Sequence, residues 1–148
     1  MIDPCTTADR PFVISGWSSS YRMTRDSTIP MPMWSEGAYH PVVDWYMSKK
    51  RSITLVSRGS TTETRRGFIC YEPAHRGTAM VHYLYVAEPY RGHGVARALL
   101  AAAGVDPSEP FDYSHRTKAS WELIEVAKKA PRAKYNPIAA RYAEEQPR

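Results

Sequence analysis

Hydrophobic residues recur at helical spacing in two segments of the first third of the chain. In residues 10–22, Val13, Trp17 and Tyr21 are four positions apart, with Asp9 as the N-cap and Pro11 near the start. The second segment has apolar side chains at the i, i+3, i+4, i+7 and i+8 positions counted from residue 39. It ends in the basic run 49–51, which suits the carboxyl end of a helix. We therefore predict two helices at the start of the chain.

The middle of the chain changes to the pattern of β-strands. Apolar and β-branched residues dominate 53–57, 67–71 and 79–86, so we predict an antiparallel meander of three strands. A helix after residue 94, a short strand over 111–114 and a last helix over 118–129, which Pro131 stops, complete the order. This order indicates the α/β (α+β) class, with a mixed, mainly antiparallel sheet flanked by helices. The length suits a single domain over 1–148.

Composition narrows the class of protein. The net charge of +5 suits an anionic partner without identifying it, and the 43% of hydrophobic residues are ordinary for a globular protein. There is no run of about 18 apolar residues and no leader-like start, so we expect no membrane association and a cytoplasmic location. Cys5 and Cys70 form no Cys-x-x-Cys pair, and the five histidines lack metal-ligand spacing. We therefore predict no metal.

Residues 81–100 carry the clearest chemical signal in the chain. An apolar strand turns at Glu88 and Pro89, and a helix rich in Ala and Leu begins after the glycines at 92 and 94. The first amides of a helix have no intrahelical acceptor, the helix dipole adds about half a positive charge there, and glycine leaves the backbone open. This arrangement predicts a site for a phosphate or pyrophosphate. A glycine turn without a ligand stays open as the alternative.

The same stretch resembles the GNAT superfamily of N-acyltransferases. The hexapeptide RGHGVA at 91–96 matches the family's Arg/Gln-x-x-Gly-x-Gly/Ala signature, and VAEPY at 86–90 is similar to the end of its fourth strand. A dinucleotide fingerprint needs Gly where Arg97 stands, and a P-loop needs Gly-Lys-Ser/Thr, so both fit worse. The order of elements is also similar, except that the first strand is weak or displaced and a short tail replaces the C-terminal hairpin arm.

The resemblance implies acetyl-CoA as the co-substrate and a splayed central pair of strands that binds it. In the family, the loop binds the pyrophosphate, and the end of the preceding strand holds the pantetheine through backbone groups. Transferred to this chain, the implied cofactor-binding residues are Leu84, Tyr85, Val86, Arg91, Gly92, His93, Gly94, Val95 and Ala96.

For the catalytic step, the resemblance implies a base for the attacking amine and a proton donor for the leaving thiolate. His82 is the candidate base, because it titrates in the useful range and lies two residues before the strand end. Alternation places His82 on one face with Leu84 and Val86, where many relatives carry a glutamate and this strand has none. Tyr135 is the candidate proton donor, and Tyr113 and His115 compete with it. A structural role for each of these residues stays open.

The leading hypothesis is transfer of an acetyl (acyl) group from acetyl-CoA to an amine acceptor, by direct attack in a ternary complex. The chain is also similar to small GNAT-like proteins of tailed bacteriophages, which keeps two alternatives open. One is a DNA-modification enzyme of the Mom type that acts on a nucleobase in the host cytoplasm, with nucleic acid as a partner. The other is a catalytically inactive, GNAT-shaped binding protein.

Overall fold

The computed structural model describes residues 1–22, 40–61, 63–75, 78–106, 109, 111–114 and 133–135. Within them the elements are β1 (Ile2–Pro4), the 3-10 turn η1 (Thr7–Asp9), α1 (Arg10–Arg22), α3 (His40–Ser48), β2 (Ile53–Arg58), β3 (Arg65–His75), β4 (Thr78–Val86), the 3-10 turn η2 (Glu88–Tyr90), α4 (Val95–Ala102), β5 (Phe111–Tyr113) and β6 (Ala133–Tyr135). The helix predicted over 10–22 is confirmed, and the helix predicted over 118–129 lies outside the described residues.

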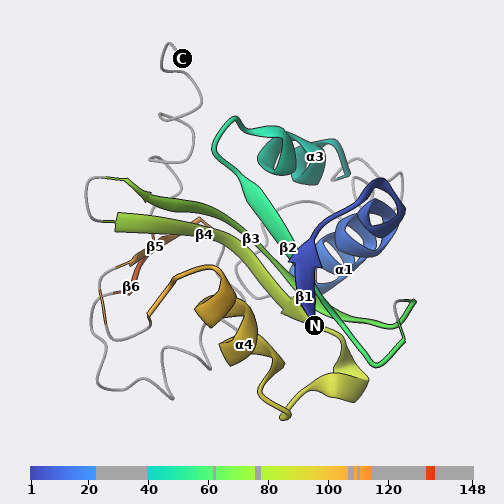
Figure 1. Ribbon diagram of the computed structural model, residues 1–148. Coiled ribbons are helices and arrows are strands. Elements are labelled where there is room, and N and C mark those ends of the chain that lie inside the picture. The colour runs from blue at the N-terminus through green and yellow to red at the C-terminus, as the bar shows by residue number, and fades with distance from the viewer. Residues whose placement is uncertain are drawn as a thin grey trace.

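Six strands of the described residues form one sheet in the order β1-β2-β3-β4-β5-β6 (Figure 1). The pairs from β1 to β4 are antiparallel, whereas β5 pairs in parallel with both β4 and β6. The predicted meander and the mixed, mainly antiparallel sheet are therefore confirmed. β1 is absent from the prediction because three residues are too few to show alternation. It is held by pairing, with Ile2 opposite Ser57 and Pro4 opposite Leu55.

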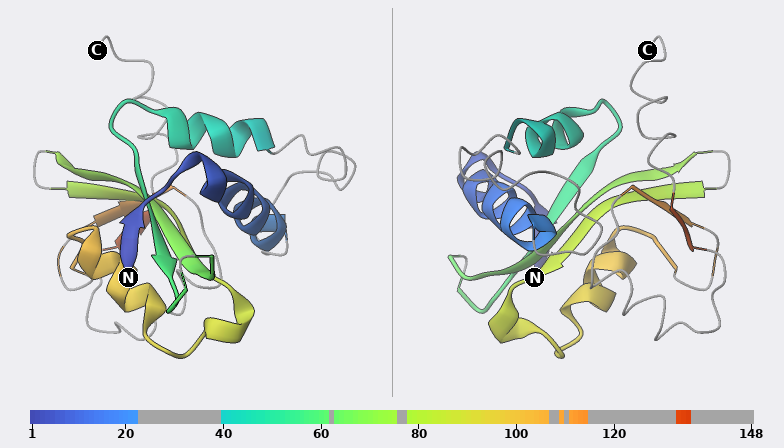
Figure 2. Two further views of the ribbon diagram at one scale, coloured as in Figure 1. Left: turned by 45° about the vertical axis from the view of Figure 1, so that its right-hand side comes forward. Right: turned by 180° about the vertical axis from the view of Figure 1, so that it is seen from behind.

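Helices cover both faces of the sheet, so two hydrophobic clusters form. α1 and α3 lie on one face and α4 lies on the other (Figure 2). The cluster under α1 and α3 contains Val13, Trp17, Val43, Val56, Phe68, Cys70 and Tyr83. The cluster under α4 contains Ile69, Tyr71, Ala79, Val81, Leu84, Val95, Leu99, Leu100 and Val105. The helical spacing of Val13 and Trp17 thus marks the buried face of α1, as the pattern predicts.

A β-bulge interrupts the pairing of β3 with β4. Cys70 lies opposite Tyr83, but the next residue, Tyr71, lies opposite Val81. His82 is therefore the extra residue on β4. A bulge of this kind re-aims the side chains on either side of it, because the alternation of faces is broken at the inserted residue.

Because of the bulge, the His82 side chain lies on the other face of the sheet from the predicted one. Leu84 packs in the cluster under α4, and Val86 packs against the same cluster. The His82 ring instead lies 5.0 Å from the ring of Tyr46, which belongs to α3 on the opposite face. The prediction that His82 shares a face with Leu84 and Val86 is wrong, because strict alternation holds only in a strand without a bulge.

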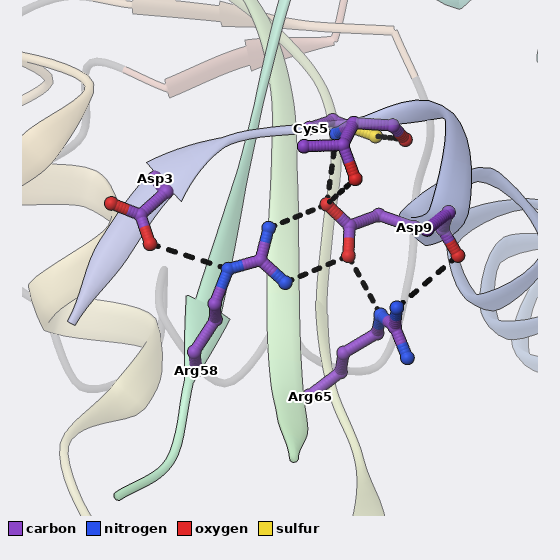
Figure 3. A network of polar contacts seen from close by, with 7 residues as sticks. Asp3, Cys5, Asp9, Arg58 and Arg65 are labelled. Atoms are coloured by element: carbon purple, nitrogen blue, oxygen red, sulfur yellow. Dashed lines mark hydrogen bonds and ion pairs between the residues drawn. The ribbon is translucent and has the colours of Figure 1, made fainter. Parts of the chain in front are cut away.

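A buried ion network fixes the N-terminal segment to the ends of β2 and β3 (Figure 3). Asp9 is fully buried, and its carboxylate accepts hydrogen bonds from Arg58 at 2.7 and 2.5 Å and from Arg65 at 2.7 Å. The same carboxylate accepts from the amide and the hydroxyl of Thr6 at 2.8 and 2.9 Å. Arg58 also donates to Asp3 of β1 at 3.2 Å. We call these five residues the N-terminal cluster.

Asp9 therefore has a different role from the predicted one. Its carboxylate reaches back to Thr6 and across to two arginines, and Thr6, not Asp9, is the N-cap of η1. The hydrogen bond from Arg58 holds the pKa of Asp9 well below its usual range, although burial opposes this. The carboxylate is thus ionised and serves to anchor the chain.

Candidate active site

The strands β4 and β5 separate after a short parallel pairing. The paired positions are Ala79 with Phe111, Met80 with Asp112 and Val81 with Tyr113. The amide of Ser114 then donates to the carbonyl of Val81 at 3.0 Å. Beyond Val81, no strand of the described residues pairs with this edge of β4, so the backbone groups of 82–86 on that edge belong to no ladder. We call this opening the strand fork, and Ser114 and His82 lie at its vertex.

The loop after β4 is shaped for an anion. Gly92 and Gly94 have φ angles of +81° and +80°, a region that other residues rarely adopt, and a Cβ on either would meet nothing within 4 Å. The amide of Ala98 bonds to the carbonyl of Gly94 at 3.0 Å. The amides of residues 95–97 accordingly have no acceptor among the described residues. Open backbone and unpaired amides at a helix start suit the pyrophosphate site predicted for residues 91–96.

Arg91 ties this loop to the end of β4. Its Nε donates to the carbonyl of Val86 at 2.9 Å, so one backbone acceptor at the strand end is engaged within the protein. Leu84 is buried in the cluster under α4, and the Tyr85 ring lies close to Gly16 of α1, where a Cβ would come within 2.8 Å of it. The side chains of Leu84 and Tyr85 are therefore used for packing. The carbonyl of Tyr85 points toward β3, where a Cβ on Gly67 would meet it at 2.4 Å, so the backbone groups of Leu84 and Val86 are the ones that face the fork.

Four polar residues form a buried group at the vertex of the fork, which we call the fork cluster: Lys49, Glu72, His82 and Ser114. His82 is 1% exposed. Its Nε2 lies 2.6 Å from Oε2 of Glu72, and its Nδ1 lies 3.0 Å from Oγ of Ser114. The Lys49 ammonium lies 3.6 Å from the same Glu72 oxygen. The cluster thus joins the residue after α3, the strands β3 and β4, and the residue after β5.

The electrostatics of the fork cluster favour a neutral imidazole beside a carboxylate. Burial lowers the pKa of His82, although the hydrogen bond to Glu72 opposes this. Burial alone would raise the pKa of Glu72, but the hydrogen bond from His82 and the charges of His82, Lys49 and Arg51 lower it further than burial raises it. With the carboxylate accepting from Nε2–H, Nδ1 is the ring nitrogen that accepts from the Ser114 hydroxyl.

Glu72 and Ser114 are not among the site residues predicted from the sequence. No glutamate lies on β4, but Glu72 of β3 is paired with Met80 of β4, and the bulge turns His82 toward it. Spacing along one strand cannot reveal a partner on the next strand, because that contact depends on the register between them. The sequence signal for Glu72 was its place directly after the predicted strand 67–71.

The other predicted catalytic residues are placed only in part. Tyr135 belongs to β6, where its backbone is in register with Tyr113 of β5, and its side chain lies outside what the structure describes. His115 lies outside the described residues. The predictions of a proton donor at Tyr135 and a competitor at His115 therefore stay predictions.

Other reactive groups of the described chain are unsuited to catalysis. Burial raises the pKa of the Cys5 thiol and raises that of Cys70 to about 12, so neither is an activated nucleophile. Over the described residues, no group of three or more His, Cys, Asp or Glu side chains could hold a metal ion. No helix in that part of the chain has the length and apolar character needed to cross a membrane.

Comparisons with known proteins agree with this geometry. A sequence model described as the acetyltransferase (GNAT) family matches residues 17–103, which is more than half of the chain. The fold is similar to that of histone acetyltransferase HPA2 and related acetyltransferase from Corynebacterium glutamicum, with a TM-score of 0.60 and 19% identity over 85% of this chain and 82% of that one. No curated protein matches the chain in sequence.

Two further solved structures share the fold. Ribosomal-protein-alanine N-acetyltransferase from Brucella melitensis biovar Abortus has a TM-score of 0.55 and 12% identity, over 87% of this chain and 89% of that one. A variant of the BH1408 protein from Bacillus halodurans has a TM-score of 0.56 and 15% identity, over 86% and 91%. At these identities the structures show a common fold alone.

Proposed function

The chain belongs to the acetyltransferase (GNAT) family, whose co-substrate is acetyl-CoA, and from this premise we propose that it transfers an acetyl group from acetyl-CoA to an amine acceptor. The amine attacks the thioester directly in a ternary complex. Residues 91–96 would hold the pyrophosphate, and the backbone of 84–86 would hold the pantetheine. Bound in this way, acetyl-CoA supplies an activated acyl group.

The strand fork carries this proposal. Its open edge runs from Val81 to the end of β4 and leads directly into the loop with Gly92 and Gly94. A ligand whose pyrophosphate lies at the start of α4 can therefore follow this edge of β4, which no strand of the described residues covers beyond Val81, toward the vertex. Fixing the thioester beside groups that accept protons gives the acceptor a defined direction of attack, which is a large part of the rate enhancement in acyl transfer.

The proton of the attacking amine needs an acceptor, and His82 is the proposed one. Its ring is neutral at pH 7, because burial lowers its pKa, and the Glu72 carboxylate at 2.6 Å stabilises the imidazolium that forms on protonation. Lys49 limits how far Glu72 favours the charged ring, because its ammonium interacts with the same oxygen. His82 can thus hold a proton briefly and release it again.

Paired substitutions at Gly94 test the cofactor site. Asn tolerates the left-handed backbone, and Asp has the same shape with a negative charge, so Gly94→Asn and Gly94→Asp differ mainly in charge. Like charges about 4 Å apart repel by roughly 1 kcal/mol in water and 4 kcal/mol near a protein surface. We therefore expect calorimetry to show acetyl-CoA binding roughly five- to several-hundredfold weaker for Asp than for Asn. Equal affinities would contradict the pyrophosphate assignment.

A second assay separates an enzyme from a binding protein. Release of the CoA thiol is measured with polyamines, peptides and aminated nucleosides as acceptors. Turnover with any of them supports the proposal and identifies the acceptor class, with nucleosides indicating a Mom-type role. Tight acetyl-CoA binding without turnover on any acceptor would support an inactive binding protein instead.

A further inference from the structure

Both ring nitrogens of His82 are already hydrogen-bonded, one to Glu72 and the other to Ser114, so the ring does not contact an acceptor directly. Both residues are buried, with exposed fractions of 1% for His82 and 4% for Ser114. On its remaining side the ring packs against Tyr46, at 5.0 Å between the ring centres. A proton that leaves the acceptor must therefore reach His82 through one of its two hydrogen-bonded partners. Glu72 is already an acceptor, so only the hydroxyl of Ser114 can pass a proton to the ring.

We propose that Ser114 is the catalytic residue that contacts the attacking amine, and that His82 and Glu72 behind it form a proton relay. This rests on the proposed acyl transfer and names the group that carries its proton step. The sequence Ser114–His82–Glu72 has the order of hydroxyl, imidazole and carboxylate found in triads, but its hydroxyl passes a proton and forms no bond to the acyl group.

The position of Ser114 supports this role. Its amide donates to the carbonyl of Val81 at 3.0 Å, so the residue is fixed as the first one beyond the last β4–β5 pair. Its Oγ lies 3.0 Å from Nδ1 of His82. The carbonyl of His82, 3.4 Å from Oγ, is an alternative acceptor for the hydroxyl proton when Nδ1 is protonated. The hydroxyl thus lies at the vertex of the fork, where the thioester of a ligand along β4 would end.

The proposed proton transfer accompanies the acyl transfer. The amine nitrogen forms a bond to the acyl carbon, and its proton moves to Oγ of Ser114 as the hydroxyl proton moves to Nδ1 of His82. The C–S bond then breaks, and its electron pair leaves with the sulfur as the CoA thiolate. The proton on His82 returns through Ser114 to that thiolate or to solvent. Ser114 ends the cycle as a hydroxyl, and Glu72 stays ionised throughout.

The first test compares the turnover of two alanine variants. Ser114→Ala should lower kcat roughly 10²-fold, within the range of general acid–base assistance, and leave the KM for acetyl-CoA within about threefold. Ser57→Ala is the matched control, because Ser57 of β2 is 6% exposed and lies outside the fork cluster. Its kcat should equal that of the unaltered protein. The loss in Ser114→Ala should shrink at higher pH, where more acceptor is already neutral.

The second test asks whether the residues act as one unit. The double variant Ser114→Ala/His82→Gln should be no slower than His82→Gln alone, since either change interrupts the same relay. Thermal melts of each variant check that the chain is folded. Independent losses that multiply in the double variant, or a Ser114→Ala rate within threefold of the unaltered protein, would overturn the relay.

A third measurement needs no turnover. Nitrogen NMR of the His82 ring should show the proton on Nε2 and an unprotonated Nδ1, with a low-field proton that disappears in Glu72→Gln. A proton on Nδ1 would overturn the relay alone. An acetyl adduct on Ser114 after incubation with acetyl-CoA would also overturn it, in favour of a covalent route. Absence of turnover with every acceptor would refute the proposed function together with the relay.

Discussion

Two buried polar clusters lie on the same sheet and differ in how completely their groups are paired. In the N-terminal cluster, the carboxylate of Asp9 accepts five hydrogen bonds, three of them from Arg58 and Arg65. In the fork cluster, Glu72 is bonded to a ring that can change its protonation state, and the ring is bonded to a hydroxyl at an open strand edge. The two clusters are similarly buried, but only the fork cluster contains a ring and a hydroxyl that can exchange a proton.

The difference shows what separates an anchor from a proton path. Arginine stays charged at all accessible pH values, and an ionised aspartate surrounded by arginines has no proton to pass. Histidine and serine both donate and accept, so protons can move along them without creating an isolated buried charge. We therefore expect changes in the N-terminal cluster to affect stability and changes in the fork cluster to affect turnover.

The largest effect on stability is expected from Asp9→Asn. The variant keeps the shape of the side chain but leaves Arg58 and Arg65 without their carboxylate, and breaking a buried ion pair in this way costs roughly 3–5 kcal/mol. Urea denaturation at pH 7 measures this loss. The pKa of Asp9 is lowered in the folded protein, so the contribution is present above its ordinary value of 3.8 and is lost as the pH falls below it. The difference between the two proteins should therefore narrow in acid.

The matching activity measurement decides whether the N-terminal cluster is only an anchor. Below the melting temperature, Asp9→Asn should turn over acceptor at the same rate per folded molecule as the unaltered protein. A large fall in kcat without loss of folded protein would show that the two clusters are not separate in function.

The sequence predicts most of the fold because hydrophobic spacing and glycines act locally. Helical spacing identifies α1 and its buried stripe at Val13 and Trp17, and the glycines at 92 and 94 identify the loop before α4. These features depend on neighbours within one or two turns. A prediction from spacing succeeds where the structure is determined locally.

The fork cluster depends instead on contacts between distant segments. Glu72 meets His82 only because β3 and β4 pair with a one-residue bulge, and Ser114 meets it only because β5 returns in parallel. The bulge reverses the face that alternation assigns to His82. The N-terminal strand is hidden for the same reason, since Ile2 is held by its pairing with Ser57 and not by any pattern of its own.

A smaller loss of stability is expected for Glu72→Gln. The amide oxygen can still accept from Nε2 of His82, but the charge that balances Lys49 at 3.6 Å is removed. Replacing a charged hydrogen-bond partner in a buried site costs roughly 1–3 kcal/mol. Urea denaturation measures this cost beside that of Asp9→Asn. If Glu72→Gln were less stable than Asp9→Asn, the fork cluster would contribute more to stability than the N-terminal cluster, contrary to our expectation.

The pH dependence of stability should identify His82 in the fork cluster. Its pKa is lowered in the folded protein, so the unfolded chain binds a proton first as the pH falls below the ordinary value of 6.5. Stability should then fall by at most about 1.4 kcal/mol per pH unit between pH 6.5 and 5. The groups that face the ring are Glu72, Lys49, Tyr46 and Ser114, and the pKa of Glu72 is lowered from its ordinary value of 4.5, away from this pH range.

The control for this titration is His82→Gln. The variant should lose the acid slope that His82 contributes. Denaturation curves of the two proteins at several pH values measure the difference in slope. An unchanged slope in the variant would mean that folding does not lower the pKa of His82.

The smallest effect is expected for an ion pair outside both clusters. Arg10 of α1 pairs with Asp44 of α3, but the two side chains are 39% and 50% exposed, so water competes with the contact. Exposed pairs contribute about 0–1 kcal/mol and are screened by salt. Asp44→Asn should therefore lower stability by less than about 1 kcal/mol, and the loss should vanish at roughly 1 M salt. Denaturation at low and high salt measures it. A loss as large as that of Asp9→Asn would show that burial is not what makes the N-terminal cluster strong.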